Sequence, residues 1–296
     1  MKKISYLIIA LLIAAAPSQA QLLWKVSGKG LTHPSYLFGS HHLAKLSIID
    51  SIKGLKPAFE STKQVIGEID MKDMMSPQVM TEMQKKMIMG GDSTLLKIFT
   101  PEESQKIDKC IQEYIPGATL AMVQKLRPAA LTNQLTVVMM AKQLGGFNMQ
   151  EQLDSYFQKE ARAKGKNVLA FETMNQQLDI LFNDTPIKRQ AELLLCLIDN
   201  IKEMSQQALQ LTAYYNHQKL DAMYQLSQKK DGNRCDSYQT EEDALIKNRN
   251  NNWMKTIPSM IKENSSFIVV GALHLAGPEG LIAQLKKAGY TVTAVK

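Results

Sequence analysis

The sequence predicts a mixed α/β (α+β) fold, in which a central mixed sheet is flanked by helices and carries a large helical insertion. Two observations lead to this prediction. Short runs that are apolar throughout alternate with segments of helical spacing, which is typical of a sheet covered on both faces. A Gly-x-x-His-Leu-Ala motif also occurs twice, at residues 39–44 and 271–276, and each copy directly follows such a run.

The first twenty residues have the features of a secretory signal peptide. Lys2 and Lys3 precede an apolar run, and the small residues Ser18 and Ala20 suit signal peptidase. The apolar run is about 13 residues long, which is shorter than the ~20 residues that span a bilayer. We expect cleavage after Ala20 and export to the periplasm or the exterior, without stable membrane insertion afterwards. An uncleaved anchor is the alternative.

Residues 21–296 are predicted to form a single domain, because no linker rich in Pro, Gly or Ser divides them. Both ends of the chain contribute strands to one sheet. The predicted strands are Tyr36–Phe38, Gln64–Ile69, Asn167–Phe171, Phe267–Val270 and Thr291–Val295. Two of them follow helices that end at a glycine, which is a common helix stop: residues 154–164 before Gly165, and residues 280–288 before Gly289.

Helical spacing dominates the middle of the chain, over residues 76–144 and again over residues 185–263. Thr100, Pro101 and Glu103 form a recognisable helix start, with a threonine cap, a proline at the first position and a capping box. Many of the seventeen methionines fall in these blocks. Methionines at helical spacing usually fill a core, although they also line adaptable binding grooves.

Composition argues against a nucleic-acid-binding protein. The formal net charge is +7, but the lysines are scattered and few aromatic residues lie between them, so we expect solvated helix faces and no nucleic-acid partner. The three cysteines, Cys110, Cys196 and Cys235, are too few for a disulfide scaffold. One bridge and one free thiol are compatible with export, and the sequence does not assign the pair.

Two histidines and two glutamates are predicted to meet at one edge of the sheet. His42 and His274 occupy equivalent places in the repeated motif, just past a strand, where open α/β sheets bind ligands. Glu68 and Glu172 lie at the ends of two other strands, and a buried carboxylate needs a compensating partner. This ligand set suits a divalent ion such as Zn, Mn or Co. Singly, such residues more often form salt bridges or cap helices.

Further residues are candidates for supporting roles. Arg249 either clamps a carboxylate of the pocket or the substrate, or lies on the surface. His41 is expected to point away from His42. Gly39 and Gly271 allow the backbone to turn sharply or to approach a ligand closely. The common zinc-enzyme and serine-nucleophile motifs, His-Glu-x-x-His, paired Cys-x-x-Cys and Gly-x-Ser-x-Gly, are absent from the sequence.

Taken in order, these motifs resemble the TraB/PrgY/GumN family, which includes the animal TIKI proteins. The resemblance covers most of the chain after the leader. It is carried by the first motif with His42, the strand with Glu68, Asp154 at its helix start, Phe171-Glu172-Thr173 followed by Gln176 or Gln177, the pair Arg249-Asn250, and the second motif with His274.

The resemblance implies a domain similar to that of erythromycin esterase and ChaN-like proteins, with the active site between the two histidine motifs. TIKI proteins are metal-dependent proteases that trim Wnt ligands and prefer Mn or Co, whereas TraB and PrgY limit the activity of peptide pheromones. Carried over by motif position, the metal or catalytic residues are His42, His274, Glu68 and Glu172. Arg249 and Asp154 support them.

We therefore predict an exported, metal-dependent hydrolase that cleaves a peptide or protein. The ion would polarise the scissile carbonyl and activate water, with Glu68 as a ligand and Glu172 as the base, or the reverse. The alternative is a protein of the TraB/PrgY type that sequesters a peptide without cutting it. An ester hydrolase is a third possibility and rests on fold analogy alone. The substrate, the metal and the oligomeric state are left open by the sequence.

Overall fold

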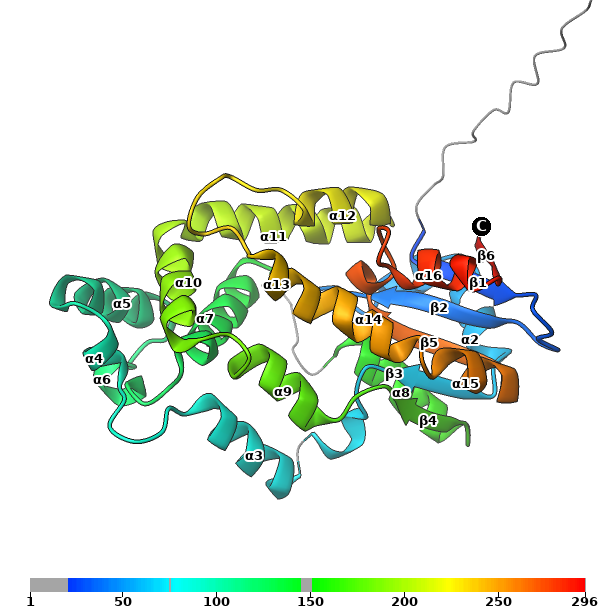
Figure 1. Ribbon diagram of the computed structural model, residues 1–296, viewed down its shortest axis with the longest axis horizontal. Coiled ribbons are helices and arrows are strands. Elements are labelled where there is room, and N and C mark those ends of the chain that lie inside the picture. The colour runs from blue at the N-terminus through cyan, green and yellow to red at the C-terminus, as the bar shows by residue number, and fades with distance from the viewer. Residues whose placement is uncertain (1–20, 75, 145–150, 296) are drawn as a thin grey trace, which may run out of the picture.

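Six strands form one mixed sheet at one end of the molecule (Figure 1). The computed structural model describes residues 21–74, 76–144 and 151–295, so the predicted signal peptide lies outside the described residues. The sheet order is β4-β3-β5-β2-β1-β6. The strands are β1 (Leu23–Ser27), β2 (Ser35–Ser40), β3 (Gln64–Gly67), β4 (Asn167–Ala170), β5 (Ser266–Gly271) and β6 (Thr291–Ala294).

All five predicted strands are confirmed, each to within two residues at either end. The first strand, β1, was not predicted. It pairs antiparallel with both β2 and β6, and it begins two residues after the expected cleavage site. The expectation that each strand is covered on both faces is wrong for the two edge strands: the residues of β4 are exposed or half-buried, and β6 has one buried residue.

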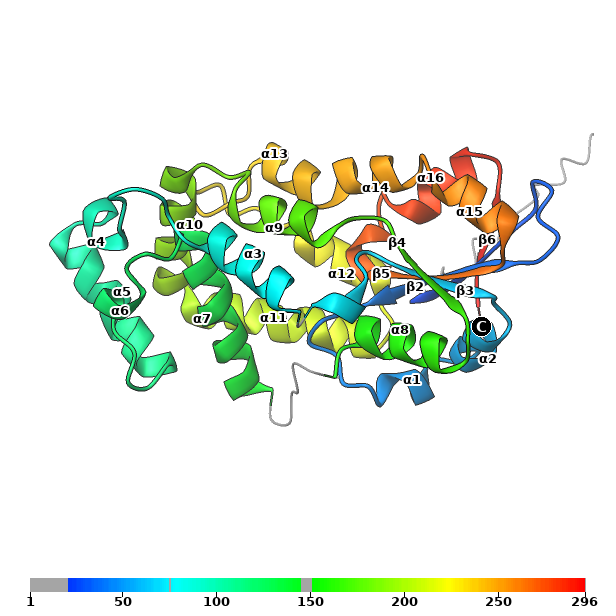
Figure 2. The same cartoon turned by 90° about the horizontal axis from the view of Figure 1, so that it is seen from below.

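The four strands β4, β3, β5 and β2 are mutually parallel, so their carboxyl ends meet at one edge of the sheet. Helices cover both faces: α1, α2 and α8 lie on one side, and α14, α15 and α16 on the other (Figure 2). These helices are α1 (Ile48–Ser51), α2 (Leu55–Glu60), α8 (Leu153–Ala163), α14 (Asn248–Trp253), α15 (Ile257–Glu263) and α16 (Leu281–Lys287). The predicted α/β class with a covered sheet is confirmed.

The predicted helical insertion extends from the carboxyl edge of these parallel strands (Figure 1). Its helices are α3 (Pro77–Met87), α4 (Leu95–Ile98), α5 (Pro101–Tyr114), α6 (Leu120–Val123), α7 (Pro128–Gln143), α9 (Met174–Phe182), α10 (Ile187–Asp199), α11 (Ile201–Asn216), α12 (Leu220–Ser227) and α13 (Gln239–Glu242). Shorter turns are the 3-10 helices η1 (Met71–Asp73) and η3 (Ala272–His274) and the π-helix η2 (Asp243–Lys247). No helix in the described part of the chain is long and apolar enough to cross a membrane.

Local sequence signals act as expected. Thr100 and Glu103 form the capping box that starts α5. Gly165 ends the segment after α8 with φ +68°, a conformation that favours glycine. Gly39 is required by close packing, because a Cβ there would lie 2.9 Å from the Cα of Ala272. A Cβ at Gly271 would make only ordinary van der Waals contacts, so close packing does not require a glycine at that position.

The sheet and the helical extension have separate hydrophobic cores, and a smaller third cluster forms around Leu178 and Phe182. The sheet core includes an aromatic cluster in which the ring of Phe157 lies 5.4 Å from Phe38 and 4.9 Å from Phe267. The helical extension packs around apolar residues such as Leu131 and Leu194. Several methionines, including Met139, are buried in these cores, as methionines at helical spacing usually are.

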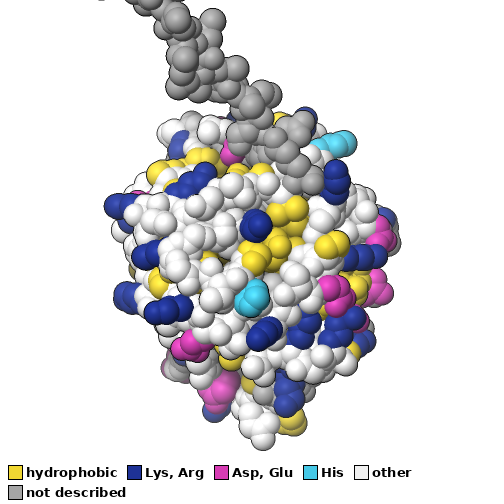
Figure 3. All heavy atoms as spheres, turned by 90° about the vertical axis from the view of Figure 1, so that its right-hand side faces the viewer, with side chains coloured by type: hydrophobic (Ala, Val, Ile, Leu, Met, Phe, Trp, Pro, Cys, Tyr) yellow, Lys and Arg dark blue, Asp and Glu magenta, His cyan; other side chains and the backbone are white. Residues whose placement is uncertain are grey.

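On the face opposite the helical extension, the visible basic side chains do not gather into one patch (Figure 3). Figure 3 shows Lys and Arg side chains on that face scattered among acidic and neutral ones. This distribution fits the scattered lysines of the sequence.

One disulfide joins α10 to the loop after α12. Cys196 and Cys235 are bonded, and Cys110 is a buried thiol whose pKa is raised to about 11 by burial and by the charge of Glu113. The bond closes a loop across a separation of 39 residues. Closing a loop of this length restricts the unfolded chain and so stabilises the fold.

We expect the double variant Cys196→Ser/Cys235→Ser to lose about 2–4 kcal/mol of unfolding free energy, because the unfolded chain regains the entropy that the bond removes. Urea denaturation measures this loss. A reductant should destabilise the wild type and leave the double variant unchanged. Equal stability of the two proteins without reductant would show that the bond contributes nothing.

Candidate functional site

The four predicted site residues lie at the carboxyl edge of the parallel strands. His42 follows β2, Glu68 follows β3, Glu172 follows β4, and His274 ends the short turn after β5. Parallel pairing of these strands explains why residues far apart in sequence share this edge. They are nevertheless not one cluster, because three of them surround Arg249 while His42 faces a neighbouring cavity.

Arg249, from α14, is the cation that compensates both glutamates. Its Nε and one terminal nitrogen donate to the two oxygens of Glu172, each at 2.8 Å, which is the bidentate geometry that guanidinium groups favour. The same terminal nitrogen donates to Glu68 at 2.6 Å. Only 11% of the Arg249 side chain is exposed, against 15% and 8% for the two glutamates. Of the three possibilities considered for Arg249, a clamp on pocket carboxylates, a clamp on the substrate and a surface position, these contacts show the first.

Neutral groups complete the hydrogen bonding of the two carboxylates. Glu68 accepts from the backbone N–H of Gly271 at 2.7 Å and from Gln177 at 3.0 Å. Glu172 accepts from the indole N–H of Trp253 at 2.8 Å. Every carboxylate oxygen of the pair therefore has at least one donor.

The hydrogen bonds around His274 define its tautomer. Asn250 donates its amide N–H groups to the carbonyls of His274 and Glu279, so its side-chain oxygen is the acceptor that faces Nδ1 of His274 at 2.8 Å. Nδ1 must then carry the proton. Nε2 is left as an acceptor, and Arg249 donates to it at 3.1 Å. His274 is thus a neutral ring that packs on Trp253, with ring centroids 4.4 Å apart.

The pKa values of His274 and Glu68 are both lowered, but for different reasons. Burial lowers the pKa of His274 to about 4, and the charge of Arg249 adds to this while that of Glu68 opposes it. Burial alone would raise the pKa of Glu68, but its neighbours His274 and Arg249 and the hydrogen bond from Gly271 hold it below its usual value. The cluster at neutral pH consists of ionised Glu68, protonated Arg249 and neutral His274.

A second group of residues lines a cavity of about 130 Å³ beside the cluster. His42 is exposed and Asp154 is half-buried, and both line this cavity together with Glu68 and Gln177. Oδ2 of Asp154 is buried and has no hydrogen-bond partner among the described residues. Burial raises the pKa of Asp154; the charge of His42 opposes this and that of Glu68 adds to it.

The remaining histidines take structural or surface positions. His41 turns away from the cavity, and its Nε2 lies 3.0 Å from the hydroxyl of Thr212. Its ring lies 5.1 Å from Tyr215, and burial lowers its pKa to about 4. His41 and His42 therefore face different surroundings, as expected. His33 and His217 are both exposed.

Two residues of the cluster were not singled out from sequence. Trp253 lies four residues after Arg249 on the same helix face, and this spacing was the available signal. Gln177 was noted only for its place in the family motif. It lies one turn into α9, where its amide reaches Glu68. The π-helix η2 directly precedes α14, and such wide turns occur frequently at functional sites.

The predicted metal ligands do not form a metal site as they are arranged. In the described parts of the chain, no three His, Cys, Asp or Glu side chains lie where they could share an ion. Both carboxylates are paired with Arg249, which provides the positive charge expected of a metal. Nε2 of His274 also faces Arg249. An ion bound among these three ligands would have to displace the guanidinium.

The protein is thus of the mixed α/β class, with a charged cluster at the carboxyl ends of its parallel strands. The chain matches the model of the TraB/PrgY/gumN family over residues 22–294, and it therefore belongs to that family. No curated protein and no solved structure matches the chain.

We expect Arg249→Met to lower the free energy of unfolding by about 3–5 kcal/mol, because two buried carboxylates lose their cation. The loss should shrink as the pH falls and these carboxylates become protonated. Urea denaturation at several pH values measures it. Lys247→Met is the matched control, since Lys247 makes only long, partly exposed ion pairs nearby. An equal effect of both variants would contradict the clamp.

We also expect stability to fall as the pH drops from 6.5 towards 4. The folded pKa values of His41 and His274 are about 4, below the ordinary value of 6.5, so the unfolded chain binds more protons in this window. Each histidine contributes a slope of about 1.4 kcal/mol per pH unit, and the stabilisation is fully present above pH 6.5. His41→Asn should reduce the slope. A flat profile between pH 6.5 and 4.5 would contradict the neutral, buried histidines.

Proposed function

We propose that this protein is a hydrolase that cleaves a peptide or protein substrate at the carboxyl edge of its sheet. One observation carries the proposal: an exposed histidine, His42, and a half-buried aspartate, Asp154, whose Oδ2 is buried, line the same cavity. The cavity volume of about 130 Å³ holds several water molecules at ~30 Å³ each. The chain belongs to the TraB/PrgY/gumN family, and the resemblance noted from the sequence implies a peptide or protein as the substrate.

The pair is suited to general acid–base catalysis. His42 takes a proton from water as the water oxygen bonds to the scissile carbonyl carbon. Asp154, whose pKa is raised by burial, gives its proton to the leaving amine as the C–N bond breaks. Proton exchange with water restores both groups. Two titratable groups in contrasting environments are the usual basis of such paired roles.

The cluster around Arg249 has a positioning role in this proposal. Glu68 contacts Arg249 and also lines the cavity, so the clamp fixes one wall of the reaction site. Glu172 accepts hydrogen bonds from Arg249 and Trp253, which leaves it poorly placed to act as the base expected from sequence. We therefore assign the base to His42.

Metal dependence stays a prediction. The donor types at this edge suit Mn, Co or Zn, but the present arrangement pairs the glutamates with Arg249. For this reason no reaction step is assigned to an ion. Export also stays a prediction, and it is supported by the Cys196–Cys235 disulfide, because such bonds persist in oxidising compartments.

We expect His42→Gln and Asp154→Asn each to lower kcat by about 10²- to 10⁴-fold, because each removes a proton-transfer group. Mass spectrometry of a mixed peptide library measures cleavage by the protein without its first twenty residues. His33→Gln is the matched control, since His33 is exposed and lies outside the site. Full turnover in His42→Gln would defeat the assignment of the base.

The same assay, run with a chelator and with added Mn or Co, separates the remaining possibilities. Cleavage that needs Mn or Co and is lost in His274→Ala would restore the metal mechanism predicted from sequence. Peptides that bind but are recovered intact after long incubation would support sequestration. Turnover of a model ester that survives both chelation and loss of both histidines would place the chemistry at a different site.

A further inference from the structure

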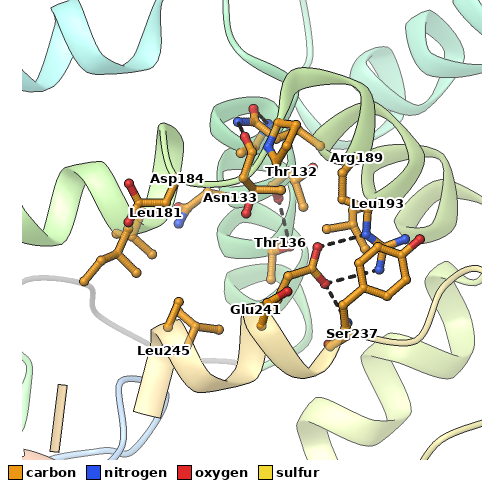
Figure 4. A pocket seen from close by; sticks show the side chains of 18 of the residues that line it. Thr132, Asn133, Thr136, Leu181, Asp184, Arg189, Leu193, Ser237, Glu241 and Leu245 are labelled. Carbon is orange, nitrogen blue, oxygen red and sulfur yellow. Dashed lines mark hydrogen bonds and ion pairs between the residues drawn. The ribbon is translucent and has the colours of Figure 1, made fainter. Parts of the chain in front are cut away.

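A cavity of about 660 Å³ lies in the helical extension, outside the site described above. Its walls come from α7, α9, α10 and the segment from Ser237 to Leu245 (Figure 4). The volume is within the range of 300–1,000 Å³ that is typical of ligand-binding pockets. It is also several times larger than the cavity beside His42.

This pocket adjoins the charged cluster along two helices. Gln177 of α9 contacts Glu68, and Leu181, four residues later, lines the pocket. Arg249 donates to the carbonyl of Leu245, four residues earlier, and Leu245 also lines the pocket. Four residues of helix rise about 6 Å. The end of the pocket marked by Leu181 and Leu245 in Figure 4 is therefore one helical turn from the cluster.

The lining combines exposed apolar side chains with short polar ones. Leu181, Tyr238 and Leu245 are 43%, 54% and 44% exposed, which is unusual for such large apolar groups gathered in one place. Thr132 and Asn133 of α7 add a hydroxyl and an amide, which are groups that hydrogen-bond to peptide main chain. An extended peptide with apolar side chains matches both features.

One charged residue of the pocket, Asp184, has no ion-pair partner among the described residues. Among the charged residues that line it, Arg189 and Glu241 are paired at 2.9 Å, as the dashed lines in Figure 4 indicate. Asp184 is exposed and makes no side-chain hydrogen bond or ion pair with any other described residue, and it lies at the Leu181 end in Figure 4. A positively charged group on the ligand would form an ion pair with Asp184.

The wall opposite Leu181 is held rigidly. Arg189 is 6% exposed and donates to the carbonyls of Arg234 and Asp236 at 2.7 and 2.6 Å, in addition to its pair with Glu241. Its guanidinium lies 3.9 Å from the ring centroid of Tyr238. The Cys196–Cys235 disulfide anchors the same loop. A pocket whose wall is fixed in this way binds with little ordering cost.

We propose that this pocket is a specificity subsite, which holds an apolar stretch of the substrate peptide and pairs Asp184 with a basic side chain or an amino terminus of that peptide. This inference rests on the proposed hydrolase function only in that it calls the bound peptide a substrate. Binding in the pocket does not depend on cleavage.

The test uses one random decapeptide library and two readouts, the peptides that immobilised protein retains and the peptides that it cuts. Wild type should enrich apolar stretches that carry a basic group. Leu181→Asp should lower the apolar enrichment about tenfold, and Asp184→Lys should abolish a basic preference of about two- to fivefold and favour acidic peptides. The matched controls are Leu96→Asp, which is 46% exposed on α4, and Asp92→Lys, which is exposed.

The outcomes separate the two proposals. Cleavage with the same sequence preference in Leu181→Asp and Asp184→Lys as in wild type would overturn the subsite and leave the hydrolase intact. Retention without cleavage, lost in these variants and kept in the controls, would support the subsite and overturn the hydrolase. A wild-type protein that neither retains nor cuts any peptide would overturn both.

Discussion

The buried charge of Arg249 is the constraint on which the strand-end site depends. Two carboxylates approach each other at the carboxyl edge of the sheet, and burial of both as ions is costly without a nearby cation. Arg249 supplies that cation with a planar group that reaches both glutamates and the ring of His274. Removing any one member leaves its partners buried without compensation, so these residues form one unit.

This clamp also divides the site into two parts with different properties. On one side, His274 is neutral, and both of its ring nitrogens are hydrogen-bonded, one to Asn250 and the other to Arg249. On the other side, His42 is exposed and Asp154 keeps a buried oxygen without a partner among the described residues. The second part is therefore the one to which we assign proton transfer. In the function proposed above, the second histidine of the repeated motif therefore has a structural role, and the first takes part in proton transfer.

Much of this arrangement was predictable from the sequence. Near-continuous apolar runs and two equivalent Gly-x-x-His motifs predicted the covered sheet and placed four side chains at one edge, because parallel strands end together. The role of Arg249 was harder to predict. It is separated from Glu172 and Glu68 by 77 and 181 residues, and no local pattern says which carboxylate a helix arginine will meet. The edge strand β4 and the unpredicted β1 likewise depend on pairings that short segments do not encode.

The tautomer of His274 tests the clamp most directly. Nitrogen-15 NMR of histidine-labelled protein, assigned with His274→Gln, distinguishes a protonated Nδ1 from a protonated Nε2. At pH 7 we expect Nδ1 of His274 to carry the proton and Nε2 to be unprotonated, with both signals unchanged when one equivalent of Zn, Mn or Co is added. A protonated Nε2, or direct coordination of His274 to the added metal with release of Arg249, would contradict the clamp and return the site to the metal centre that the sequence suggested.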